Sequence, residues 1–129
     1  MTRQEIFDKV ASHLLTQNAK STLPINLHEQ MSSNLYASCA YRGEYGMACA
    51  IGCLIPDELY EERYEKKSMD HCDVLDLLTK LGFADEFSLL NAFQCVHDQY
   101  NVSDWYEKLL DISASYGINS LVLKNFKQV

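Results

Sequence analysis

The stretch from Cys39 to Pro56 constrains the fold of this chain more than any other. It holds three of the five cysteines and three of the five glycines. Two apolar runs, 35–42 and 47–51, flank the glycine-bearing residues 43–46, a pattern typical of an antiparallel β-hairpin. Gly52 follows directly and, because it has no side chain, it predicts a close approach of a neighbouring segment.

Length and composition predict one compact domain over residues 1–129. Of the 129 residues 47% are hydrophobic, which excludes a disordered chain, yet no apolar run reaches the roughly 20 residues that span a bilayer. The formal net charge of −7 disfavours direct nucleic-acid binding, which depends on Lys and Arg neutralising phosphates.

The expected compartment is the cytoplasm, with no membrane association. Residues 1–17 mix charged and apolar side chains, so they do not form the uninterrupted apolar core of a secretory signal. In a reducing compartment an odd number of cysteines is better explained by free thiols than by a disulfide framework.

Helical periodicity dominates the rest of the chain. Thr2 and Glu5 form a capping-box pattern before a helix that runs to Gln17. Segment 22–34 is predicted to be a connection, with one turn at 27–31. Further helices are expected in several places, with cap residues at their ends: from Pro56 to about Tyr64, from Ser68 or Asp70 to Gly82, from Asp85 or Glu86 to Tyr100, from Asn101 or Ser103 to Gly117, and, as a helix or an edge strand, from Asn119 to Phe126.

The predicted fold class is therefore α+β and mainly α. About five or six helices would pack around one short antiparallel β-hairpin.

Several motifs resemble a group of small uncharacterised proteins from bacteria and their phages. The matching segments are Cys39–Gly43, Gly46–Asp57 with Tyr60, and Gln94–Asp98 with Trp105. The resemblance implies a common fold unit and a bacterial or mobile-element origin, and it implies no specific chemistry.

One chemical hypothesis makes Cys49 a nucleophile, with His97 as its base and Asp98 or Asp57 as the orienting acid. A thiol requires a base or a helix N-terminus to become a thiolate. Against this, His97 falls on the apolar stripe of its helix, and Asp98 points about 100° away around the same helix. The competing interpretation is a half-buried histidine that hydrogen-bonds a carbonyl near a packed cysteine.

A metal site is the second chemical hypothesis. The pool of ligands contains Cys39, Cys49, Cys53, His71, Cys72 and His97. The cysteines lack the paired Cys-x-x-Cys spacing of zinc sites. A four-residue hairpin loop would place Cys39 and Cys49 on opposite faces of the sheet, whereas a five-residue loop would place them directly opposite each other, where they could share a metal or a disulfide. The sequence therefore predicts neither a metal nor another cofactor.

The remaining signal is an acidic, tyrosine-rich segment after Pro56, in which Leu59 is expected to turn inward. Such a segment is either a solvated face or a docking surface for a basic protein. We expect a non-enzymatic protein-binding module that acts on a host protein, with a small Cys/His-dependent hydrolase or transferase as the alternative. The predicted contact residues are Arg42, Tyr60, Glu61, Glu62, Tyr64 and Glu65.

Overall fold

The chain folds around a helical core. The computed structural model describes residues 1–22 and 39–126, so the predicted connection 22–34 lies almost entirely outside the described residues, as does the start of the predicted first strand. Helix α1 (Arg3–Gln17) begins with the predicted capping box, in which Thr2 and Glu5 each bond the other's backbone N–H. The predicted first helix is therefore confirmed.

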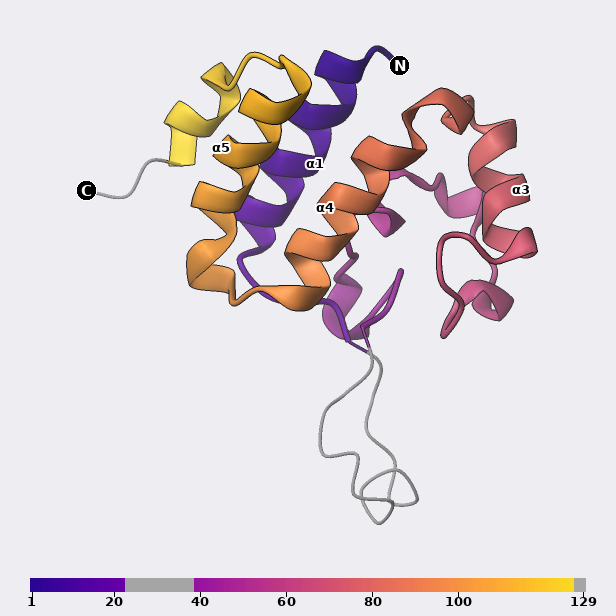
Figure 1. Cartoon of the computed structure of the whole chain (residues 1–129). Coiled ribbons are helices and arrows are strands. Elements are labelled where there is room, and N and C mark those ends of the chain that lie inside the picture. The colour runs from indigo at the N-terminus through magenta and orange to yellow at the C-terminus, as the bar shows by residue number, and fades with distance from the viewer. Residues whose placement is uncertain (23–38, 127–129) are drawn as a thin grey trace.

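Helices α4 (Phe87–Gln99) and α5 (Trp105–Tyr116) pack beside α1 and form the centre of the molecule (Figure 1). Phe7 on α1 meets Phe93 on α4 with ring centroids 5.9 Å apart. The predicted apolar stripe of α4 is buried from Leu89 to His97, and Trp105 is fully buried. The chain then returns over α1 as a 3₁₀ helix, Leu121–Phe126, in place of the strand that was the other possibility for this segment.

Helix α3 (Cys72–Lys80) lies on the far side of α4 from α5 (Figure 1). Gly82 follows it with a φ of +88°, and the Phe83 N–H donates back to the Leu78 carbonyl, as the sequence predicts for a left-handed cap. The prediction of one helix from Pro56 to about Tyr64 is wrong. Two separate 3₁₀ turns, Asp57–Leu59 and Glu62–Tyr64, stand there.

The predicted β-hairpin is wrong, and with it the α+β class. Within the described residues the structure is helical and has no strand or sheet. Among the described residues of the two segments, one isolated bridge joins Arg42 and Ala48, with a 3₁₀ turn, Glu44–Gly46, between them. Five residues separate the bridge partners.

Side chains, together with the backbone of residues 21–22, take the place of a partner strand, since the Ala40 N–H donates to the Ser21 carbonyl at 2.9 Å. The Glu65 carboxylate accepts the N–H groups of Tyr41 and Arg42 at 2.9 and 3.0 Å. Gln17 bonds both backbone groups of Ala48, at 2.9 Å to its N–H and 3.0 Å to its carbonyl. Backbone groups satisfied in this way no longer require a β ladder.

Gly52 confirms the predicted close approach. A Cβ atom at this position would lie 1.9 Å from the carbonyl oxygen of Tyr41. The segment after the bridge therefore crosses the backbone of Tyr41 at a distance that only glycine permits.

Candidate functional site

His97 is the buried polar centre of the molecule. Its side chain is 0% exposed and its ring stacks on Trp105 with centroids 5.6 Å apart. The Nε2 atom accepts the Ser21 N–H at 2.9 Å, which assigns the ring proton to Nδ1, 2.7 Å from the Asp98 carboxylate. Both ring nitrogens are therefore engaged by the protein.

The sequence argument that Asp98, about 100° away around the helix, does not easily orient this imidazole is wrong. Nδ1 lies close to its own backbone, so the short side chain of the next residue reaches it despite the angle between the two residues on the helix. The expected carbonyl partner is also wrong, since the Nε2 atom faces a backbone donor. His97 thus ties α4 to the chain after α1 and has no free lone pair for use as a base.

Asp98 is held as a carboxylate. Burial by itself would raise its pKa, but hydrogen bonds from His97, Gln94 and Cys39 outweigh this effect and keep the pKa below its ordinary value. The Gln94 amide donates to both carboxylate oxygens at 3.1 Å.

Cys49 lies in a buried environment that disfavours the thiolate form a nucleophile requires. Its side chain is 0% exposed, its sulfur accepts the Gly52 N–H at 3.3 Å, and burial raises the pKa of the thiol to about 12. Gln94 contacts both this thiol and Asp98, so in the described structure an amide links Cys49 to Asp98, and no hydrogen bond joins Cys49 to His97. Nothing in this arrangement generates a thiolate.

Alkylation of the folded protein tests this assignment. We expect iodoacetamide to modify the exposed Cys72 and Cys95 first, and Cys49 only after denaturation, because the thiolate must be both formed and reachable. Peptide mapping by mass spectrometry gives the order of modification. Selective modification of Cys49 in the folded chain would contradict the burial described here.

The structure brings Cys39, rather than Cys49, to His97 and Asp98. One ligand atom from each of the three residues lies within 4.8 Å of the others. Burial raises the Cys39 pKa to about 11, and the neighbouring Asp98 charge adds to the effect. Sequence reasoning missed this grouping because Cys39 and His97 are far apart in the chain and no spacing rule connects them.

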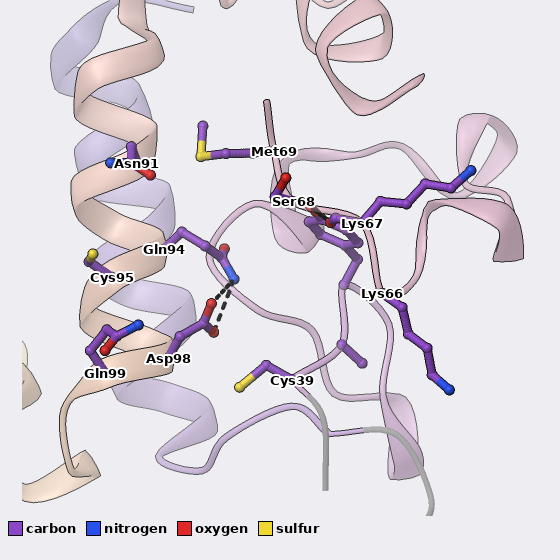
Figure 2. A pocket seen from close by; sticks show the side chains of 12 residues that line it. Cys39, Lys66, Lys67, Ser68, Met69, Asn91, Gln94, Cys95, Asp98 and Gln99 are labelled. Carbon is purple, nitrogen blue, oxygen red and sulfur yellow. Dashed lines mark hydrogen bonds between the residues drawn. The ribbon is translucent and has the colours of Figure 1, made fainter. Parts of the chain in front are cut away.

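A cavity of about 330 Å³ opens beside this cluster, between α4 and the segments 39–41 and 66–69. Figure 2 shows Gln94 and Asp98 pointing from α4 toward Cys39, while the side chains of Lys66 and Lys67 point away. A metal ion here would need the Nδ1 lone pair of His97, which would move the ring proton to Nε2 and against the Ser21 N–H. The hydrogen bonds of this cluster therefore have a structural role, joining α4 to the chain after α1.

Three of the predicted contact residues form internal scaffold. Arg42 donates to the Ile55 carbonyl and pairs with Asp57, and its guanidinium stacks over the Tyr60 ring at 5.2 Å. The Tyr60 hydroxyl donates to Glu65, the same carboxylate that holds the backbone of Tyr41 and Arg42. These three side chains hold the 40–65 region together, and most of their polar groups are engaged in contacts within the protein.

Of the other three, Glu61 and Tyr64 line an acidic groove and Glu62 does not. Tyr64 is 5% exposed and forms part of its floor, while Glu61 and Glu62 are exposed. The groove has a volume of about 390 Å³ and lies between the 3₁₀ turns and α3. Its lining carries four carboxylates and two cations, which come from Glu58, Glu61, Asp73, Asp76, Arg63 and Lys80.

Two features of the groove favour a ligand over a merely solvated face. Leu59, which was expected to turn inward, is 44% exposed and lines the groove. Arg63 pairs with Glu61 at 3.0 Å and with Asp73 at 3.4 Å, so the charges of the lining that remain are the carboxylates of Glu58 and Asp76 against the single cation of Lys80. The groove therefore exposes one apolar side chain, Leu59, within a lining that has more carboxylates than cations.

Comparison with family models, curated proteins and solved structures finds no match to this chain. Across residues 1–22 and 39–126, no helix is both long and apolar enough to cross a membrane.

Proposed function

We propose that this protein is a non-enzymatic binding module that takes a basic segment of a protein partner into the acidic groove between residues 58–64 and α3. One observation carries the proposal: the groove combines a net excess of carboxylates with the exposed side chain of Leu59. Complementary charge speeds encounter and selects the partner, while an apolar contact adds affinity.

The state of the thiols supports a binding role over the Cys/His enzyme. Burial raises the pKa of Cys39, Cys49 and Cys53, and the imidazole of His97 is committed at both nitrogens. All five cysteines are free, which agrees with the proposed cytoplasmic location in a bacterium or its phage.

A charge-reversal pair tests the groove. Glu58 and Asp76 are exposed and line the groove, and within the described residues neither side chain makes a hydrogen bond or an ion pair, so Glu58→Lys with Asp76→Lys should leave stability nearly unchanged. We expect this variant to bind a fluorescent arginine-rich peptide with a central leucine at least about tenfold more weakly than the parent, by anisotropy at low salt.

The control has the same charge change elsewhere. Glu107→Lys with Asp111→Lys alters two exposed acids of α5, on the opposite side of α4 from the groove (Figure 1). The control should bind the peptide like the parent. Equal weakening in both variants would mean that only the overall charge matters, and no binding by the parent would also refute the groove as a site for basic segments.

A further inference from the structure

The N-terminus of α3 gathers three different metal-ligating atoms on adjacent residues. The Cys72 sulfur lies 3.8 Å from Nδ1 of His71 and 3.9 Å from a carboxylate oxygen of Asp73. The His71 Nδ1 atom lies 3.9 Å from the other oxygen of Asp73. The side chains are accessible, with 42% of His71 and 30% of Asp73 exposed.

These separations are close to those around a tetrahedral ion. With bonds of about 2.0 to 2.3 Å, the ligands of a zinc ion lie roughly 3.3 to 3.8 Å from one another. The two contacts to Asp73 involve its two different oxygens, and one ligand atom from each residue lies within 4.8 Å of the others, so rotation of these accessible side chains is needed to bring all three donors onto one ion.

The histidine tautomer separates this cluster from the buried one. Nδ1 of His71 accepts the Asp73 N–H at 3.2 Å, so its lone pair is present and the ring proton belongs to Nε2. An ion would replace that hydrogen bond and leave Nε2–H in water. At His97 the proton occupies Nδ1, and Nε2 is sealed against Ser21.

The carboxylate of Asp73 is ionised and already oriented. The Arg63 guanidinium lies 3.4 Å from its Oδ1 atom, a contact that a bound ion would replace. The Lys67 Nζ atom sits 2.7 Å from one carboxylate oxygen. This contact holds the side chain near the thiol and the imidazole of the two preceding residues.

We propose that His71, Cys72 and Asp73 form a site for a borderline-soft divalent ion of the Zn²⁺ class, with water completing the coordination. Sulfur and imidazole ligands favour Zn²⁺ or Co²⁺ over Mg²⁺ or Ca²⁺, which prefer oxygen. Binding converts the Cys72 thiol to a thiolate and releases its proton to solvent. The site is independent of the groove test, because neither Glu58 nor Asp76 is a ligand.

Titration of the reduced 129-residue chain with Co²⁺, without oxygen, tests the site. We expect one equivalent to produce a thiolate-to-cobalt charge-transfer band that Zn²⁺ then removes. Cys72→Ser should abolish the band, and His71→Asn should weaken binding at least about tenfold while keeping a good helix cap. Circular dichroism confirms that both variants are folded.

Two matched cysteine variants distinguish this site from the alternatives. Cys95→Ser changes another exposed thiol, and Cys39→Ser changes the thiol beside His97. Both should keep the band. Loss of the band in Cys39→Ser with retention in Cys72→Ser would place the ion at the buried cluster and overturn the proposal, as would the absence of any band in the parent.

Discussion

Trp105→Ala should lower the free energy of unfolding by about 3 to 5 kcal/mol. The indole is 0% exposed, stacks on His97 and donates its N–H to the Tyr100 carbonyl at 3.3 Å. Its removal opens a cavity beside His97, which accepts the Ser21 N–H and so ties α4 to the chain after α1. Urea denaturation monitored by circular dichroism measures the loss.

Two comparison variants separate packing from other effects. Trp105→Phe keeps an aromatic ring against His97, so it should lose clearly less than the alanine variant. Leu121→Ala removes a side chain that is 58% exposed and should change stability by no more than about 0.5 kcal/mol. A Trp105→Ala protein as stable as the parent would show that this ring is not in the core.

Gly52→Ala should destabilise the protein by about 3 kcal/mol or more, at the upper end of overpacking effects. The new Cβ atom would lie 1.9 Å from the Tyr41 carbonyl oxygen and 2.7 Å from its carbon. Backbone atoms cannot swing away as the end of a flexible side chain can, so the whole crossing must open. Thermal or urea unfolding provides the measurement.

Gly46→Ala is the matched control for this substitution. Nothing lies within 4 Å of a Cβ at Gly46, but its φ of +73° is unfavourable for alanine. We therefore expect a loss of about 1 kcal/mol from backbone strain alone. If both variants lost the same amount, the tight crossing at Gly52 would not be a steric constraint.

The region predicted to be a sheet shows how side chains organise this protein. Glu65, Gln17 and Gln94 accept the backbone N–H groups of Arg42, Ala48 and Ile51, respectively. Each of these carboxylates and amides comes from a different part of the chain. Substitutions at Glu65 would therefore unfold this region rather than report on partner binding, which is why the groove test avoids that residue.

The helices that carry local signals could be predicted from the sequence. Thr2 and Glu5 mark the start of α1, and Gly82 and Gly117 mark the ends of α3 and α5 with positive φ values. The buried stripe of α4 and the core position of Trp105 also follow from helical periodicity. These features depend on residues a few positions apart, so one sequence contains all the information needed.

The tertiary structure decided which distant groups meet. Apolar runs around Gly43 and Gly46 are compatible with a hairpin, and only the position of Glu65 and Gln17 shows that their backbone groups bond side chains instead. Likewise Cys39, and not Cys49, lies beside His97. The chain segment after α1 packs against α4 there, where the Ser21 N–H donates to His97. Such contacts arise from the packing of the whole chain, where burial forces each polar group to find a partner whatever its distance in sequence.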